Sequence, residues 1–318
     1  VLQFDGRSWE LIKSNGPVYA LFIKSDGQIM WGGVNGFGMI TRSPQGISRL
    51  STISKEGITG IFKIEETENG IYFLSEESIY HFSNNEVVGV KASGLSGSFT
   101  NLFELYGKLH VSTTSNGIYR VQNDQLEKIK FDFVESDQVL FSVKNENQYI
   151  LATDASRIYR CTPDLRLTEI ELQDKAYAEA SVIMNGSWVH NNLVALATLR
   201  GGIVFINPTT GKTEEIINYT AGLPDNEVFS IFTDRNQNVW TSHDYGFTKI
   251  SPQLPFRSFS HYPGLEGNLL CAITFNNQVY IGTSLGLYKL SKEDAYDEIV
   301  YYVDVEVRKQ VQITSSQQ

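Results

Sequence analysis

Residues 222–250, GLPDNEVFSIFTDRNQNVWTSHDYGFTKI, alternate turn clusters with short apolar runs. Gly222–Asn226 is a turn cluster, because glycine accepts positive φ, proline fixes φ, and Asp and Asn side chains bond their own backbone. Three strand-like runs follow it: Val228–Phe232, Val239–Thr241 and Phe247–Ile250. Short apolar runs and period-two alternation are typical of strands. The segment therefore predicts a three-stranded antiparallel meander, whose apolar residues on both faces require neighbouring sheets to cover them.

The same pattern recurs along the chain at a regular spacing. Segments 18–40, 99–121, 138–161 and 270–290 repeat it closely, and segments 58–82 and 180–206 repeat it more loosely. The equivalent position in the third turn is held by Gly36, Ser78, Gly117, Arg157, Gly202, Gly246 and Gly286, which are 39 to 45 residues apart. Seven units with a period of about forty residues are typical of a β-propeller with four strands per unit.

The predicted fold class is all-β: a seven-bladed β-propeller with four-stranded antiparallel blades and under about 5% helix. The fourth strands are expected at Ile47–Leu50, Val87–Val90, Leu126–Phe131, Leu167–Leu172, Glu214–Asn218 and Phe256–Phe259. Each is short and ends in turn residues or charge, as expected of an outer, half-solvated strand. The helix-like patch Asp174–Ala180 is expected to lie in a loop.

One domain is expected over residues 1–307, followed by a flexible tail over residues 308–318. We interpret Val1–Phe4 as a third strand and Trp9–Ile12 as a fourth, so that the chain opens in the middle of a blade and is expected to be part of a longer protein. Ring closure would add either Trp9–Ile12 or Glu298–Val307 to the blade built on residues 270–290. Of the two, we favour the N-terminal strand.

Charge and composition exclude several classes of protein. The formal net charge is −10, which disfavours nucleic-acid binding because that needs clustered Lys and Arg. No apolar stretch approaches the roughly 18 residues of a spanning helix, so no membrane contact by this segment is expected. No metal or cofactor is expected either, because no Cys, His or acidic spacing matches a metal site. Cys161 and Cys271 fall three blades apart and are expected to be buried free thiols.

The stretch 222–250 resembles the two-component-regulator propeller repeat, whose usual form is GLPxNxVxxIxxDxxGxxWxGTxxGLxxF. The positions that match are Gly222, Leu223, Pro224, Asn226, Val228, Ile231, Asp234, Trp240, Gly246 and Phe247. The departures are Asn238 for the second-turn glycine and Thr241-Ser242 for the Gly-Thr pair. The opening segment 1–40 looks like a second signature of the same group, in sensor proteins of Bacteroidetes type. The resemblance covers essentially the whole chain, strongly in units one, six and seven.

The resemblance implies the sensory part of a one-component or hybrid two-component system, in the periplasm or elsewhere outside the cytoplasm. Its implied partners are a small-molecule or glycan-fragment ligand, downstream signalling domains of the same chain, and a second copy in a homodimer. The sequence itself contains no kinase histidine box, no ATP-binding glycine pattern and no helix-turn-helix. The predicted function is therefore that of a ligand-sensing input domain.

A ligand site is expected on the propeller face that carries both the turns between second and third strands and the turns between blades. The residues expected to bind ligand are Asn35, Phe37, Arg157, Arg200, His243 and Tyr245. Arg157 and Arg200 break the repeat where sister units keep glycine or small residues, and such breaks indicate function better than regular positions. Arg200, His243 and Tyr245 are expected to lie together. Further candidates are Asn116, Asp137, Tyr177, Glu179, Asp225, Asn226 and Leu285, whereas Trp31 and Trp240 are expected in the core.

Two other function classes stay open. An enzyme would need paired carboxylates, a metal cluster or a nucleophile beside a base. Only His243 and His190 are expected to reach the binding face, and no serine or cysteine motif accompanies them, so we expect no catalysis. A protein-interaction scaffold is the main alternative, although the Gly-His and Trp-Asp signatures of WD repeats are missing.

Overall fold

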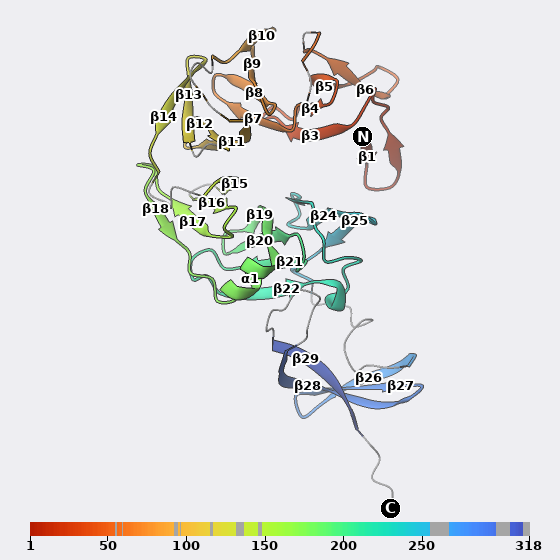
Figure 1. Ribbon diagram of the computed structural model, residues 1–318. Coiled ribbons are helices and arrows are strands. Elements are labelled where there is room, and N and C mark those ends of the chain that lie inside the picture. The colour runs from red at the N-terminus through yellow and green to blue at the C-terminus, as the bar shows by residue number, and fades with distance from the viewer. Residues whose placement is uncertain are drawn as a thin grey trace, which may run out of the picture. The chain divides into compact units, whose positions relative to one another are not determined.

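The computed structural model describes residues 1–54, 56–58, 60–91, 95, 97–114, 117–131, 137–145, 148–254, 267–296 and 306–313, the last strand and residues 290–296 by their backbone. The regular secondary structure of these residues is almost entirely β-strand (Figure 1). The helical elements among them are one α-helix, α1 (Lys175–Ser181), and one 3-10 turn, Tyr219–Ala221. The all-β prediction is confirmed.

The first half of the chain forms meander sheets, in which strands adjacent in sequence pair antiparallel. The first sheet contains β3 (Val18–Ile23), β4 (Ile29–Gly33), β5 (Gly36–Arg42) and β6 (Ser48–Thr52). The second contains β7 (Lys63–Thr67), β8 (Gly70–Leu74), β9 (Ile79–Ser83) and β10 (Glu86–Gly89). The third contains β11 (Phe99–Leu105), β12 (Lys108–Thr113), β13 (Gly117–Gln122) and β14 (Gln125–Ile129). A hairpin of β1 (Leu2–Phe4) and β2 (Trp9–Leu11) precedes them.

The second half repeats the same unit. The fourth sheet contains β15 (Val139–Lys144), β16 (Tyr149–Thr153), β17 (Ile158–Cys161) and β18 (Leu167–Glu169). The fifth contains β19 (Ile183–His190), β20 (Leu193–Thr198), β21 (Ile203–Ile206) and β22 (Thr213–Ile217). The sixth contains β23 (Ser230–Thr233), β24 (Val239–His243) and β25 (Gly246–Ile250). The seventh contains β26 (Leu269–Phe275), β27 (Gln278–Thr283), β28 (Gly286–Tyr296) and β29 (Glu306–Ile313).

The four-stranded antiparallel unit is therefore confirmed, and in the described residues it recurs at the predicted period. The fourth strand expected in the sixth unit, Phe256–Phe259, lies outside the described residues. The number of blades in a closed ring stays a prediction.

Two compact units divide the chain: Val1–Ser142 with Cys161–Leu167, and Val143–Arg160 with Thr168–Gln318. In the first unit, the second sheet contributes side chains to two cores. Ile71 and Phe73 face the first sheet, where Phe73 stacks on Phe37 with ring centroids 3.8 Å apart. Tyr72 and Leu74 face the third sheet. The two pairs alternate along β8 because successive side chains of a strand point to opposite faces.

The second unit contains a core between the fifth and sixth sheets. Ala195, Ala197 and Phe205 of the fifth sheet are fully buried against Ile231 and Val239 of the sixth. The small alanine side chains allow the two sheets to approach closely around the large Phe205 ring. This packing holds the turns at the ends of β20 and β24 in place.

Several expectations about the chain's ends and loops were wrong. The patch expected as a loop at 174–180 is the helix α1. The tail expected from residue 308 begins inside β29, which pairs antiparallel with β28. The fourth strand of the seventh sheet is β29 and not the N-terminal strand that we favoured. Trp9–Leu11 pairs with Leu2–Phe4, as expected of a third and a fourth strand. Cys271 is exposed, whereas Cys161 is buried as expected.

Candidate functional site

In the second, third and fifth sheets, a hydroxyl at or directly after the end of the second strand bridges the turn to the third strand. Thr198 Oγ1 accepts a hydrogen bond from the Gly201 amide (2.9 Å) and donates one to the Gly202 carbonyl (2.8 Å). Ser75 in the second sheet and Thr113 in the third make the same bridge. Because the hydroxyl satisfies a backbone donor and a backbone acceptor, the turn is fixed without using the side chains at its tip. Those side chains remain available at the surface.

Loops that connect successive sheets lie against these turns. The Gly60 amide donates to the Val34 carbonyl (3.3 Å), and the Phe99 amide donates to the Glu76 carbonyl (2.8 Å). In the second unit, the Gly202 amide donates to the Asn226 carbonyl (2.8 Å). The prediction that the two kinds of turn share one face is confirmed at these three places.

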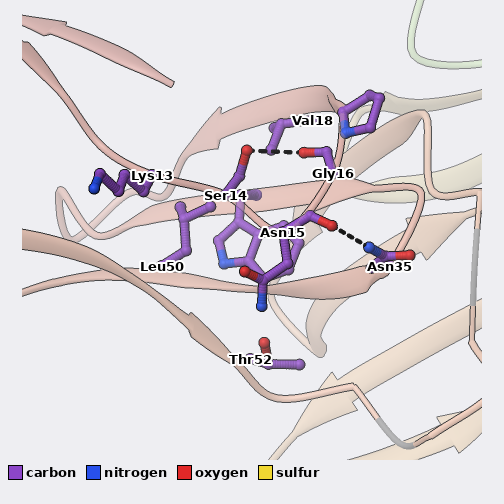
Figure 2. Close-up of a pocket in the computed structure, with 10 residues that line it drawn as sticks. Lys13, Ser14, Asn15, Gly16, Val18, Asn35, Leu50 and Thr52 are labelled. Carbon is purple, nitrogen blue, oxygen red and sulfur yellow. Dashed lines mark hydrogen bonds between the residues drawn. The ribbon is translucent and has the colours of Figure 1, made fainter.

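A cavity of about 170 Å³, which we call the first-sheet pocket, lies where the loop before β3 meets the first sheet (Figure 2). Residues 13–18 form one wall, and Asn35 in the β4–β5 turn forms another. The Asn35 side-chain amide donates to the Asn15 carbonyl, and Ser14 Oγ donates to the Gly16 carbonyl (2.8 Å). The loop is thus fastened to the turn by a residue that the sequence singled out.

Trp31 forms the floor of the first-sheet pocket together with Leu50 and Thr52. Gly38 lies between Trp31 and Thr52 in the cross-strand register. Because Gly38 has no side chain, the indole can lie across β5, and its Nε1–H donates to the Ser51 carbonyl (3.2 Å). Trp31 is only 6% exposed, as expected of a core residue.

The side chains that line the first-sheet pocket are mostly polar, and one of them is charged. Its polar groups are the Lys13 amine, the hydroxyls of Ser14 and Thr52, and the amides of Asn15 and Asn35. Among the described residues that line it, Lys13 alone is charged. Neutral donors and acceptors around one cation suit a small neutral or anionic ligand, and the volume is below the roughly 300–1,000 Å³ of drug-sized sites.

Four of the six residues expected to bind ligand are accessible. Asn35, Arg200 and Tyr245 are exposed, and Arg157 is half-buried, each in the turn before its third strand. Tyr245 is 77% exposed, so its ring can be covered by a ligand or partner. Of these four, Asn35 lines the first-sheet pocket.

The other two residues are part of the protein interior. Phe37 is fully buried and stacks on Phe73, because residue 37 faces the second sheet. His243 is 6% exposed, and its Nε2 lies 2.7 Å from Thr248 Oγ1 on the neighbouring strand. His243 therefore supports its own hairpin, which corrects the expectation that it lies with Arg200 and Tyr245 at the surface.

Some of the remaining candidate residues stabilise turns, and others are exposed to solvent. Tyr177 of α1 is buried and donates from its hydroxyl to the Gly201 carbonyl (2.7 Å), so the helix supports the turn that carries Arg200. Asn226 accepts from the Tyr219 amide (2.7 Å) through its side chain, as a turn former does. Glu179 and Leu285 are exposed, Asp225 is half-buried, and Asn116 lies outside the described residues.

The sequence analysis missed the loop that closes the first-sheet pocket. Ser14-Asn15-Gly16-Pro17 is a turn cluster directly before the first strand, so it occupies the place of a turn between blades. Its position before the first strand could have identified this loop as part of a binding site, because turns between blades lie on the expected ligand face.

No cluster of three or more His, Cys, Asp or Glu side chains that could hold a metal ion occurs among the described residues. In the same part of the chain, no helix has the length and apolar character needed to span a membrane.

No family model and no curated protein matches this sequence. Solved structures do match it. The extracellular domain of a proposed hybrid two-component system from B. thetaiotaomicron matches with a TM-score of 0.62 at 15% identity, over 100% of this chain and 43% of that chain. The WD40 β-propeller domain of Doa1 matches with a TM-score of 0.60 at 13% identity, over 80% of this chain and 86% of that chain.

An enzyme is also among the similar structures. Virginiamycin B lyase from Staphylococcus aureus matches with a TM-score of 0.54 at 10% identity, over 84% of this chain and 92% of that chain. At such identities the likeness shows the fold: an all-β chain of four-stranded antiparallel sheets that is similar to propellers. The match to the extracellular domain agrees with the resemblance to the regulator repeat, and this chain spans less than half the length of that domain.

Proposed function

We propose that this chain is a ligand-sensing β-propeller of seven blades that forms the extracytoplasmic input part of a larger one-component or two-component signalling protein. The observation that carries the proposal is the match of the whole chain to the extracellular domain of a proposed hybrid two-component system. The repeat motif around Asp234 and Trp240 supports it independently, because it was identified from the sequence alone.

The ligand in this proposal is a small polar molecule, such as a glycan fragment, that binds on the face carrying the turns. The first-sheet pocket supports this, because Lys13 and the amides of Asn15 and Asn35 offer hydrogen bonds above the apolar floor of Trp31. Binding would change the arrangement of a homodimer, and the downstream domains of the same chain would carry the signal. Nucleic acid, metal and membrane take no part.

A panel of mono- and oligosaccharides, screened by thermal shift and confirmed by calorimetry, tests this proposal. We expect at least one sugar to raise the melting temperature of the wild-type protein. A Lys13→Gln/Asn35→Ala variant should bind a ligand of the first-sheet pocket about 10-fold or more weakly, since hydrogen bonds to charged groups contribute about 1.5–3 kcal/mol. Lys212→Gln is the matched control, because Lys212 pairs with Glu214 on an exposed surface. Failure of every sugar to bind would contradict ligand sensing.

A non-catalytic interaction scaffold is the second candidate. It is supported by the match to a WD40 domain and by the exposed side chains of Tyr245 and Leu285. Arg200→Ala/Tyr245→Ala tests it. A scaffold predicts that this variant loses a protein partner while sugar binding is unchanged. Catalysis is the least supported class, because His243 is buried and bonded to Thr248. Turnover of any bound sugar would contradict the non-catalytic proposal.

A further inference from the structure

A histidine joins the second and third sheets. His81 lies on β9, and its Nδ1 is 2.8 Å from a carboxylate oxygen of Asp124, in the turn between β13 and β14. Its Nε2 is 2.9 Å from the backbone carbonyl oxygen of Asn69, in the turn between β7 and β8. His81 is only 9% exposed, so water competes little for these two contacts. One ring thus connects a turn of each sheet.

The partners of both ring nitrogens are acceptors. An ionised carboxylate and a backbone carbonyl carry lone pairs and no proton, so each contact requires an N–H group from the ring. Neutral imidazole has one N–H group, whereas imidazolium has two. The two hydrogen bonds of His81 therefore form together only when the ring carries a positive charge. In either neutral form, the lone pair of one ring nitrogen would face the lone pairs of an oxygen.

The orientation of the His81 ring is fixed by its neighbours. Tyr72 lies opposite His81 in the register of β8 and β9, and the two rings stack with centroids 4.3 Å apart and 4° between their planes. A cation over the face of a tyrosine ring is favourable. Gly70 allows the β7–β8 turn to approach, because a Cβ there would lie 2.8 Å from His81 Nε2. Both nitrogens are thus held toward their acceptors.

The charges around the ring favour its protonated form. The nearest charge is the Asp124 carboxylate, which is partly exposed to solvent, and Val88 opposite His81 on β10 is uncharged. Among the described residues, the other titratable side chains that the register places on the facing sides of the two sheets are Lys63, Glu65, Glu86, Glu104, Tyr119 and Lys128. With Asp124 included, carboxylates outnumber amines in this set, which favours a cation between the sheets.

We propose that His81 is a pH-sensitive clasp that joins the second and third sheets while its ring is charged. In this state the ring ties the β7–β8 turn and the β13–β14 turn to β9. Loss of one proton as pH rises removes one of the two hydrogen bonds, and the joint between the sheets loosens. Imidazole is the side chain that ordinarily exchanges a proton between about pH 5 and 8. The clasp does not depend on the ligand proposed for the first-sheet pocket.

The sign of this pH dependence distinguishes the clasp from the other buried histidine of the third sheet. The clasp stabilises the folded chain at low pH and is lost as pH rises, because the joint uses both ring protons. Both ring nitrogens of His110 lack a partner among the described residues, so burial disfavours its charge and acts in the opposite direction. His110 stacks with Phe103 on the side of the third sheet that faces away from His81.

Nitrogen-15 NMR of the histidine rings in the wild-type protein tests the charge directly. A ring nitrogen that carries a proton resonates far from one that does not, so a titration from about pH 5 to about pH 10 follows the two nitrogens of His81 separately. Both nitrogens should be protonated at the low end of this range, and one should lose its proton within it. A His81 ring with a single protonated nitrogen throughout the range would overturn the proposal.

Hydrogen exchange tests whether this proton holds the joint. The Lys91 amide donates to the Asp124 carbonyl oxygen (2.8 Å), so its exchange reports on the contact between the two sheets. His81→Phe keeps a ring beside Tyr72 and removes both donors. At the low end of the pH range, the Lys91 amide should exchange about fivefold or more faster in this variant than in the wild type. This ratio should fall along the same pH curve on which the ring loses its proton.

Two controls separate a local clasp from a general loss of stability. The Ile61 amide donates to the Gly33 carbonyl (3.0 Å) between the first and second sheets, and it should exchange alike in both proteins. His190 is exposed, so His190→Phe should leave Lys91 exchange unchanged at every pH. Equal acceleration at Lys91 and Ile61, or a Lys91 ratio that stays constant while the ring loses its proton, would overturn the clasp.

A second variant serves if His81→Phe does not fold. Asp124→Asn keeps an acceptor oxygen beside His81 Nδ1 and removes the negative charge. It should accelerate exchange of the Lys91 amide at the low end of the pH range and leave the Ile61 amide unchanged. Wild-type exchange at Lys91 in this variant would contradict the clasp, and the wild-type NMR titration decides the charge of the ring without any variant.

Discussion

The indole Nε1–H of Trp240 donates a 2.9 Å hydrogen bond to the carboxylate of Asp234 across the second turn of the sixth sheet. The same carboxylate accepts from the Asn236 amide (2.8 Å) and the Asn238 amide (3.0 Å). Asp234 and Trp240 are two of the positions that define the repeat motif in the sequence. Their spacing in the motif thus has a physical cause: one side chain fixes the turn and orients the tryptophan of the next strand.

Removal of the Asp234 carboxylate should destabilise the sixth sheet. Burial tends to raise the pKa of Asp234, but donation by Trp240 and Asn238 outweighs it and lowers the pKa to about 2. We expect Asp234→Ala to lower the free energy of unfolding by about 1–3 kcal/mol in urea titrations, since several backbone and indole donors lose their acceptor. Asp244→Ala, at an exposed position in the next turn, is the control. Equal effects of the two changes would contradict a role for the turn network.

Stability should depend on pH through His110, which is fully buried in the third sheet. Burial, assisted by the charge of Arg120, lowers the pKa of His110 to about 4. The unfolded chain binds this proton near pH 6.5, and the folded protein binds it only near pH 4. The free energy of unfolding should therefore fall as pH falls from 6.5 to 4, by about 3 kcal/mol from this group.

Urea titrations at several pH values measure this dependence. His110→Phe should remove most of the fall between pH 6.5 and 4, because the packing against Phe103 and Phe131 is kept while the titrating group is lost. His190 is exposed, so His190→Phe should retain the wild-type dependence. A fall that persists unchanged in His110→Phe would show that another group is responsible.

Two turn glycines should respond differently to alanine. Gly202 has φ +74°, and a Cβ there would lie 2.3 Å from the Ile217 carbonyl oxygen. Gly246 has φ +117°, and a Cβ there would meet nothing within 4 Å. Gly246→Ala should cost about 1–2 kcal/mol for its backbone conformation, and Gly202→Ala should cost clearly more because it adds a clash. Unfolding free energies of the two variants test this, and similar losses would contradict it.

Ring closure can be measured in solution. On β3, Ala20 and Phe22 face the second sheet, whereas Tyr19, Leu21 and Ile23 are exposed on the opposite face. An apolar sheet face of this kind needs a cover, which a closed seven-bladed ring provides. Small-angle X-ray scattering should then give a radius of gyration of about 20 Å, the value expected for a compact domain of this length. A markedly larger value would contradict closure.

Most of the fold could be predicted from the sequence, because its signals are local. Period-two alternation predicts strands such as β24 and β25, and turn residues such as Gly246 separate them. The patch that forms α1 was recognised as helix-like but was expected in a loop, because a pattern of seven residues is too short to distinguish a helix from a loop. Its stability comes from tertiary contacts such as the hydrogen bond from Tyr177 to the Gly201 carbonyl.

The candidate site was predicted less well, because exposure is not a local property. The sequence by itself determined only that Asn35, Phe37, His243 and Tyr245 lie in or beside equivalent turns. Only the tertiary structure decided that Phe37 packs on Phe73 and that His243 bonds Thr248, while Asn35 and Tyr245 remain accessible. A side chain near the end of a strand faces the core or solvent according to whether a neighbouring sheet covers that face. Packing between sheets, and not the spacing of residues within one, determines this.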